Sequence, residues 1–224
     1  MKPFALALLA ALAVSHADAQ TGTVVPDPAL RAELAGMYAA DQEVRLRILA
    51  AGVPARMGTA GLAPADSVLL AEMAATDAAH TVRFQQIVKT CGWPSAALAG
   101  ADGANAAFFV VQHAVPAVQE EMLPLVEAVY RNGDLPGPSY ALLIDRVLVN
   151  RGEPQVYGTQ ATRVDQWVNG EPSVGPTIRD ATLDARRAEV GLPPLDVYLR
   201  MLKQVYAAPA ASGQQMCRTR VPRS

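Results

Sequence analysis

The sequence predicts a mainly α-helical protein: a single-domain antiparallel helical bundle with a small β-hairpin or ordered loop near residues 155–178. Apolar side chains recur at helical spacing along most of the chain, and prolines and glycines divide it into helix-length segments with short connections. One stretch differs, because it is rich in Val, Thr and Tyr and contains Asn169-Gly170, a strong hairpin signal. With 224 residues, 51% of them apolar, the chain can bury a sizeable core in one domain.

Two long helices open the predicted bundle. The first covers residues 28–51, because it starts with a proline after the N-cap candidate Asp27 and stops at Gly52. The second covers residues 64–90, after a glycine-rich connection, and Gly92 ends it. Apolar residues in both helices are spaced three and four apart, so each helix can bury one face against a neighbour.

Five shorter helices are predicted to follow. Prolines and glycines set their ends, and the first of the five is apolar nearly all round, which indicates central burial. The five ranges are 104–114, 116–131, 139–150, 180–190 and 193–206. The hairpin or loop precedes the last two helices. Because a two-stranded ribbon is too small to be stable alone, we expect it to dock on the helices.

The N-terminal residues predict an exported protein. Lys2, an apolar run over residues 4–14 and Ala17-Asp18-Ala19 have the order of a signal peptide with its cleavage site. The apolar run is shorter than the roughly 20 residues of a permanent membrane helix, although a retained anchor is the alternative. We therefore expect a periplasmic or secreted protein with no membrane span after cleavage. The expected divisions are a signal peptide over 1–19, a linker over 20–27, a helical domain over 28–206 and a flexible tail over 207–224.

Composition and motifs exclude several function classes. Nineteen basic against 21 acidic residues give a net charge of −2, so no basic field predicts a nucleic-acid partner. Two cysteines are too few for a cysteine-rich scaffold or a four-cysteine zinc site, and Cys91 and Cys217 either form a disulfide or remain free thiols. Without a phosphate loop, a nucleophile motif or a dense set of metal ligands, the sequence predicts neither a cofactor nor a metal.

Polar residues inside apolar helices predict a pocket or an internal network, because a buried polar group is costly without a partner. Gln112 and His113 end a very apolar helix, and histidine suits proton transfer near neutral pH. His113 is therefore the candidate general acid or base, with a purely structural histidine as the alternative. Arg146 follows Asp145 in an apolar frame, and its guanidinium fork suits a carboxylate or phosphate of a ligand or of a partner residue.

Charged pairs on the first two helices complete the candidate site. Asp41 and Arg45 are four apart and can form an ion pair, while Asp77 and His80 are three apart and can share a face. Two such groups alone do not make a metal site. The candidate ligand-binding residues are Gln112, Arg146, Gln155, Tyr157, Thr159 and Gln160. The candidate supporting residues are Asp41, Gln42, Arg45, Asp77, Asp145, Asp184 and Arg187.

In this order the residues resemble an uncharacterised bacterial family, domain of unknown function 6624, over roughly residues 30–200. The resemblance rests on Asp41-Gln42, Arg45, Asp77, Gly92-Trp93-Pro94, Gln112-His113-Ala114, Asp145-Arg146-Val147, Gln155-Val156-Tyr157-Gly158-Thr159-Gln160, Asp184, Arg186-Arg187 and Gly191-Leu192. The chain departs from the family pattern at His80, where asparagine is usual, which argues against a histidine metal ligand there. The family has no established activity, so the resemblance implies only that these residues belong together in one structural or functional unit.

Two function classes remain open at this point. The first is an enzyme with His113 as general acid or base, which would hydrolyse a small polar or anionic molecule or an envelope component. The second is a non-catalytic structural or binding module of the cell envelope, in which the same residues form a buried polar network. A protein–protein partner in the envelope is a weaker third reading, because aromatic residues are only 5% of the chain.

Overall fold

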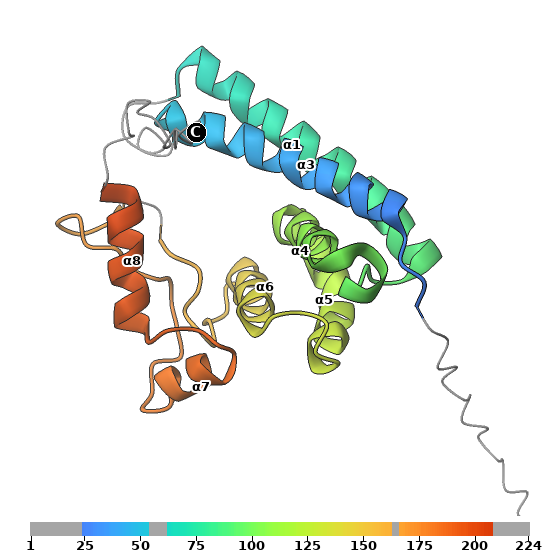
Figure 1. Ribbon diagram of the computed structural model, residues 1–224. Coiled ribbons are helices and arrows are strands. Elements are labelled where there is room, and N and C mark those ends of the chain that lie inside the picture. The colour runs from blue at the N-terminus through green and yellow to red at the C-terminus, as the bar shows by residue number, and fades with distance from the viewer. Residues whose placement is uncertain (1–23, 54–61, 163–165, 208–224) are drawn as a thin grey trace, which may run out of the picture.

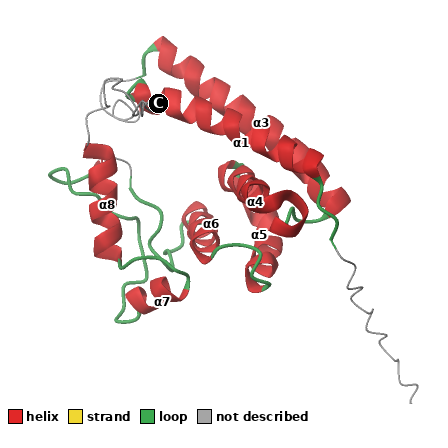
Figure 2. Ribbon diagram, in the orientation of Figure 1, coloured by secondary structure: helices red, strands yellow, loops and turns green. Residues whose placement is uncertain are grey.

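The computed structural model describes residues 24–53, 62–162 and 166–207, and within these ranges it is mainly helical (Figure 2). Its helices are α1 (Pro28–Ala50), α3 (Pro64–Cys91), α4 (Ala96–His113), α5 (Pro116–Arg131), α6 (Gly137–Asn150), α7 (Leu183–Glu189) and α8 (Leu195–Ala207). The prediction of a mainly α-helical fold is confirmed. The predicted signal peptide, nearly all of the predicted tail and Cys217 lie outside the described residues.

Five of the helices pack around one main apolar core. Figure 1 shows α3 running back alongside α1, with α4 packed against both; α5 and α6 pack against each other and against α4. The last two helices, α7 and α8, lie beyond α6. The main apolar core is shared by α1, α3, α4, α5 and α6, and a smaller cluster around Val44, Ile48 and Val53 lies at the other end of the α1–α3 pair.

Helix α1 begins where the sequence predicts and places an acid in its apolar stripe. The Asp27 side chain accepts a hydrogen bond from the Leu30 backbone nitrogen at 2.9 Å, which confirms the N-cap. The buried residues of α1 are Leu30, Leu34, Met37, Asp41, Val44 and Ile48, spaced three and four apart. Asp41 therefore occupies a position that faces the core and not the solvent.

Two helices start earlier than the sequence predicts. Helix α4 begins at Ala96, because the Ser95 side chain caps it, and a kink at Gly100, whose φ is 74°, separates its first residues from the part that contains the predicted range. Helix α6 begins at Gly137, in a segment that its prolines mark as a breaker. A Cβ atom at Gly137 would lie 2.6 Å from the Val190 carbonyl oxygen, so this glycine permits close approach of α6 to the end of α7.

Of the two alternatives predicted near residues 155–178, the β-hairpin is not seen, because the described residues contain isolated bridges and no strand (Figure 2). Asn169 and Gly170 do form the expected tight turn, with φ angles of 54° and 72° and an antiparallel bridge from Val168 to Glu171. No ladder extends through residues 155–160, because several of their backbone N–H groups donate to Asp145 of α6 instead. The segment is therefore an ordered loop that is held by side chains.

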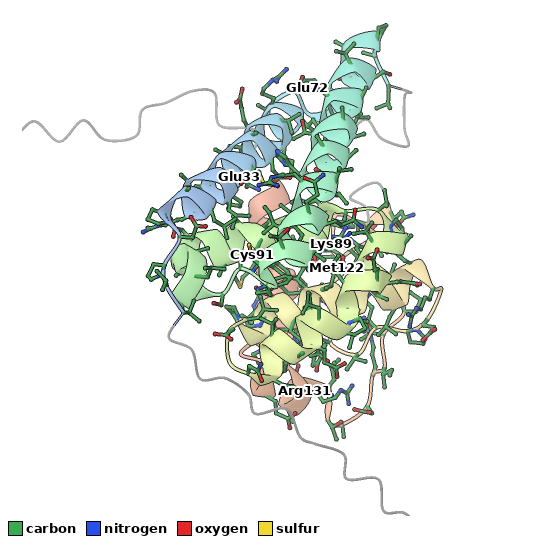
Figure 3. All side chains as sticks on the ribbon, turned by 90° about the vertical axis from the view of Figure 1, so that its right-hand side faces the viewer. Glu33, Glu72, Lys89, Cys91, Met122 and Arg131 are labelled. Atoms are coloured by element: carbon green, nitrogen blue, oxygen red, sulfur yellow. The ribbon has the colours of Figure 1, made fainter. Side chains whose placement is uncertain are left out.

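The surface of the described helices carries ion pairs between neighbouring elements. Glu33 of α1 accepts from Arg83 of α3, and Glu72 of α3 accepts from Arg47 of α1 (Figure 3). Cys91 is exposed at the C-terminal end of α3. Among the described helices, none combines the length and the apolar character that crossing a bilayer requires.

Candidate functional site

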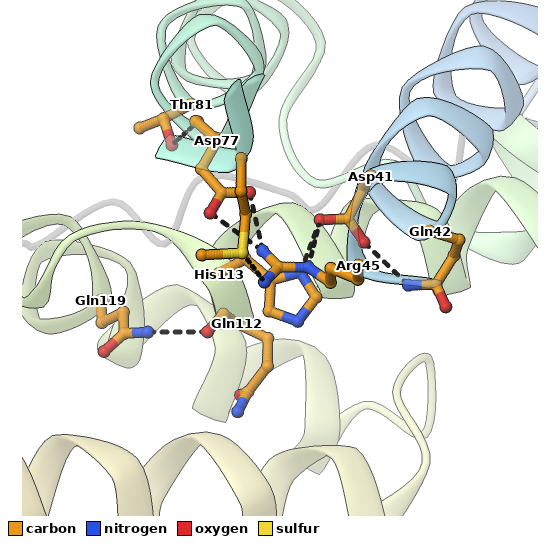
Figure 4. A network of polar contacts seen from close by, with 9 residues as sticks. Asp41, Gln42, Arg45, Asp77, Thr81, Gln112, His113 and Gln119 are labelled. Carbon is orange, nitrogen blue, oxygen red and sulfur yellow. Dashed lines mark hydrogen bonds and ion pairs between the residues drawn. The ribbon is translucent and has the colours of Figure 1, made fainter. Parts of the chain in front are cut away.

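Three helices bring a histidine, an arginine and two carboxylates together (Figure 4). His113 Nδ1 lies 2.8 Å from Asp41 Oδ1, and the same oxygen accepts from Arg45 Nε at 2.9 Å. Arg45 Nη2 donates to both oxygens of Asp77, at 2.7 and 2.9 Å. The other Asp41 oxygen accepts from Gln42 Nε2 at 2.8 Å. Arg45 therefore bridges α1 to α3, and Asp41 joins α1 to the end of α4.

The positions of these residues follow from helical periodicity. Asp77 lies one turn before the buried Thr81, whose hydroxyl donates to the Asp77 carbonyl oxygen at 2.7 Å, so the carboxylate points toward α1 and not into solvent. His113 is the last residue of α4 and lies one turn after the buried Val110. The next helix starts at Pro116, which fixes the chain direction just beyond the histidine.

The two carboxylates have opposite pKa shifts. Burial raises the pKa of Asp41, but the hydrogen bonds and positive charges of His113 and Arg45 outweigh it and bring the pKa to about 2. For Asp77 burial is the largest effect and raises the pKa, although the charge and hydrogen bond of Arg45 oppose it. Asp41 is thus held as a carboxylate, whereas the charged form of Asp77 depends on Arg45.

The ionised Asp41 sets the tautomer of His113. A carboxylate can only accept hydrogen bonds, so His113 Nδ1 must carry the proton in this contact. In the neutral ring Nε2 then has the free lone pair, and it has no hydrogen-bond partner among the described residues. The ring also packs near Phe109, with 5.7 Å between centroids. A histidine that is oriented through one nitrogen and open at the other is equipped for proton transfer.

A small cavity of about 10 Å³ lies beside this cluster, near the space that one water molecule needs. Asp41, Asp77, His80 and His113 line it together with apolar side chains of α1 and α4. One ligand-type atom from each of Asp41, Asp77 and His113 lies within 4.8 Å of the others, so these three residues could hold a cation. Arg45 already supplies the positive charge between the carboxylates, and a cation would have to displace it.

Gln112 and Arg146 stand apart from this cluster because buried polar atoms of both have no partner. Gln112 is 3% exposed, and neither its side-chain nitrogen nor its side-chain oxygen has a hydrogen-bond partner among the described residues. The same holds for Arg146 Nε, and Arg146 makes no ion pair with a described residue. Burial lowers the pKa of Arg146, and the positive charge of Arg45 lowers it further.

A second network holds residues 155–160 against α6. Asp145 is fully buried, and its oxygens accept from the backbone nitrogens of Val156, Tyr157 and Thr159 and from the Thr159 hydroxyl, at 2.8 to 3.0 Å. On the other side of the loop, the buried Arg187 donates to the carbonyl oxygens of Tyr157, Gly158 and Pro193. The loop thus presents its N–H groups to an anion and its carbonyl groups to a cation.

The remaining residues of the loop bond to the protein itself. Gln155 Oε1 accepts from the Gln160 backbone nitrogen at 2.7 Å, and Gln160 Nε2 donates to the Leu142 carbonyl oxygen at 3.0 Å. Burial raises the pKa of Tyr157 to about 12. Asp184 accepts from the Leu195 backbone nitrogen and so caps α8. The ligand-binding roles of Gln155, Tyr157, Thr159 and Gln160 stay predictions.

Apart from Gln112 and Arg146, the predicted site residues therefore fall into two groups, and no hydrogen bond between described residues joins these groups. The first contains Asp41, Gln42, Arg45, Asp77 and His113; the second contains Asp145, Gln155, Tyr157, Thr159, Gln160, Asp184 and Arg187. The predicted pair of Asp41 and Arg45 is present, whereas Asp77 pairs with Arg45 in place of the expected His80.

Sequence reasoning missed Gln119 and Asn150, which link α4, α5 and α6. Gln119 Nε2 donates to the Gln112 carbonyl oxygen at 2.8 Å, and Gln119 Oε1 accepts from Asn150 Nδ2 at 2.9 Å. A signal was available for Gln119, because it lies three and seven residues before the buried Met122 and Val126 on the apolar face of its helix.

The ionisation of Asp41 should make the free energy of unfolding depend on pH in the acidic range. Its pKa is about 2 in the folded protein, below the ordinary 3.8, so the unfolded state takes up the proton first as the pH falls. The resulting stabilisation, about 1–2 kcal/mol, is complete above about pH 4 and is lost toward about pH 2. Asp41→Asn should therefore be less stable than the wild type near neutral pH, and the difference should shrink in acid, as urea unfolding measures. A difference that is the same at all pH values would contradict this account.

The comparisons with known proteins agree with the resemblance noted in the sequence. The model of a family described only as a family of unknown function, DUF6624, matches residues 28–210. No curated protein and no solved structure matches the chain. The matched region includes both polar networks and covers far more than half of the 224 residues. The chain therefore belongs to the family of unknown function DUF6624.

Proposed function

We propose that this exported protein binds a small polar ligand beside His113 and that His113 acts on it as general acid and base, most simply in hydrolysis. The observation that carries the proposal is the contact between His113 Nδ1 and the ionised Asp41, which in the neutral ring leaves Nε2 with a lone pair and without a hydrogen-bond partner among the described residues. Within the described part of the chain, the Gln112 amide and Arg146 Nε are buried without a hydrogen-bond partner, and these two residues are candidate binding groups in this proposal.

The chemistry needs only the groups of this chain and water. His113 Nε2 takes a proton from a water molecule while the oxygen of this water attacks an acyl carbon of the ligand. The imidazolium is stabilised by Asp41, and it then gives the proton to the leaving oxygen or nitrogen, so that the histidine returns to its starting state. Asp41 acts as a positioning residue in this scheme, because it touches the histidine and not the ligand.

The test is hydrolysis of a panel of ester and amide derivatives of N-acylated amino acids. His113→Gln should lower kcat/KM by about 10²- to 10⁴-fold for any compound that the wild type hydrolyses, because the proton acceptor is lost. Arg131→Gln is a suitable control, since Arg131 is exposed at the end of α5 and pairs with Glu127 of the same helix. A fully active and folded His113→Gln protein would overturn the catalytic role.

A second candidate function is a non-catalytic module in which the cluster fixes how the helices pack. It is favoured by Arg45, which contacts Asp41 on its own helix and Asp77 on α3 and so ties two helices together without a ligand. If the wild type hydrolyses no compound of the panel and His113→Gln lowers the melting temperature, this candidate replaces the first.

A further inference from the structure

The cluster of Asp41, Asp77 and His113 has the groups to hold a metal ion as well as to move a proton. We infer that one ring nitrogen of His113 and one carboxylate oxygen of each aspartate form a binding site for a single divalent transition-metal ion of the Zn²⁺ type, and that this ion and Arg45 compete for the two carboxylates. The site goes beyond the proposed function, because metal binding needs no turnover by His113.

The three ligand groups already converge, and they come from α1, α3 and α4 (Figure 4). One ligand atom from each of Asp41, Asp77 and His113 lies within 4.8 Å of the other two. Bonds of about 2.0–2.2 Å to a tetrahedral zinc ion set the ligand atoms about 3.3–3.6 Å apart. The separation of 2.8 Å between His113 Nδ1 and Asp41 Oδ1 and the limit of 4.8 Å bracket these values, so small side-chain rotations bring the three groups into place.

A space of the right size lies beside the ligand groups. The cavity of about 10 Å³ is lined by all three of them and by His80. It is close to the space of one water molecule, so it admits a single ion but no organic ligand. The walls are partly shielded from solvent, because the side chains of Asp41 and His113 are 7% and 18% exposed. An ion in this cavity is therefore held between helices and not on an open acidic surface.

The types of ligand atom select the metal. A histidine nitrogen suits Zn²⁺ and related transition metals, whereas Mg²⁺ and Ca²⁺ prefer oxygen ligands. One imidazole and two carboxylates make three protein ligands and leave a fourth position for water. The two carboxylates also balance the charge of a divalent ion, so the loaded site is neutral when Arg45 is absent from it.

Arg45 is the internal competitor for the ion. It donates to Asp41 Oδ1 at 2.9 Å and to the two oxygens of Asp77 at 2.7 and 2.9 Å. A guanidinium and a divalent ion repel each other strongly at such distances, so the ion binds when Arg45 turns away. The Arg45 side chain is 26% exposed, which gives it a route into solvent. Arg45 should therefore weaken metal binding, which is the opposite of the effect of a ligand residue.

Metal binding also changes which nitrogen of His113 carries the proton. The nitrogen that faces Asp41 is Nδ1, and it binds the ion through its lone pair. The single proton of the neutral ring then passes through solvent from Nδ1 to Nε2. Because Nε2 is a donor in this state, it cannot take a proton from water. The ion is thus an inhibitor of the proposed hydrolysis.

Isothermal titration of the chelator-treated full-length protein with ZnCl₂ at neutral pH measures the binding without any substrate. We expect the wild type to bind one Zn²⁺ per chain in the micromolar to millimolar range, with no comparable binding of Mg²⁺. Asp77→Asn and His113→Gln should each weaken Zn²⁺ binding by at least about tenfold, because each removes a ligand. Arg45→Met should strengthen it by at least about tenfold, because the competing cation is lost.

Two controls separate this site from other binding of zinc. Glu72→Gln removes an exposed carboxylate of α3 that pairs with Arg47, and it should bind Zn²⁺ as the wild type does. Replacing both Cys91 and Cys217 with serine removes the thiols of the chain and should also leave the affinity unchanged. Zn²⁺ should raise the melting temperature of Arg45→Met more than that of the wild type, since the ion takes the place of the lost cation.

The inference is overturned if neither the wild type nor Arg45→Met binds Zn²⁺ saturably, if His113→Gln binds it as tightly as the wild type, or if Arg45→Met binds it no more tightly. The metal site and the proposed function are separate results. A protein that binds Zn²⁺ as expected but hydrolyses no compound keeps the site and loses the enzyme. A protein that hydrolyses a compound but does not bind Zn²⁺ keeps the enzyme and loses the site.

Discussion

Replacing Asp145 with asparagine is expected to destabilise the protein by about 3–5 kcal/mol, which corresponds to a fall in melting temperature of roughly 10 °C. The fully buried carboxylate accepts four hydrogen bonds, one oxygen from two backbone N–H groups and the other from the Thr159 backbone and hydroxyl. In asparagine one of these oxygens becomes an NH₂ group. With the NH₂ group toward Val156 and Tyr157, two backbone N–H groups lose their acceptor; with it toward Thr159, the hydroxyl can turn and accept, but the Thr159 backbone N–H still faces a donor.

Loss of the Asp145 carboxylate should also remove a negative charge that favours the charged form of Arg187 on the other side of the loop. Arg187 is fully buried and has no carboxylate among its hydrogen-bond partners in this network: burial lowers its pKa, and the electrostatic interactions with Tyr198, Asp184 and, least of the three, Asp145 oppose this change. We therefore expect faster proteolysis of residues 152–162 as well as a lower melting temperature in circular dichroism. Asp134→Asn, at an exposed position in the α5–α6 turn, is the control and should change neither. An Asp145→Asn protein as stable as the wild type would show that the loop is held by other contacts.

Local sequence signals predicted the helices well, because those signals act within a few residues. Asp27 and Pro28 set the start of α1, and Pro116 sets the start of α5, as expected from capping and from the fixed φ of proline. The early start of α4 was missed although Ser95 is a common N-cap residue, since the Ala-Gly-rich residues before Ala104 lack apolar periodicity. The start of α6 depends on contact with Val190, which lies more than fifty residues further along the chain.

The candidate site was harder to predict, because its contacts cross between helices. The i, i+4 pair of Asp41 and Arg45 follows from spacing alone. The contact of Asp41 with His113 spans 72 positions and depends on how α1 packs on α4. In the loop, the backbone N–H groups of Tyr157 and Thr159 donate to Asp145. Every residue except proline has a backbone N–H group, so the residue types at these positions do not predict this contact.

Arg45→Met should reveal how strongly the cluster holds α1 and α3 together. The change removes the cation between Asp41 and Asp77 while it keeps a long apolar side chain, and we expect a loss of about 2–4 kcal/mol near neutral pH. The carboxylates would then face each other with only His113 to offset their charge, since one oxygen of each lies within 4.8 Å of the other. Arg45→Lys keeps a positive charge but not the two-armed geometry, so its stability should lie between the wild type and Arg45→Met.

The pH dependence separates loss of charge from loss of packing. Burial raises the pKa of Asp77 and Arg45 opposes the rise, so removing Arg45 should raise this pKa further. A folded-state pKa above the unfolded value makes the folded protein take up the proton first, and its stability then increases as the pH falls through that pKa. The deficit of Arg45→Met in urea unfolding should therefore be largest near neutral pH and smaller at about pH 4. Adding Asp77→Asn should recover part of it at neutral pH. If the deficit does not change with pH and the double variant recovers nothing, Arg45 acts through its packing and not through the two carboxylates.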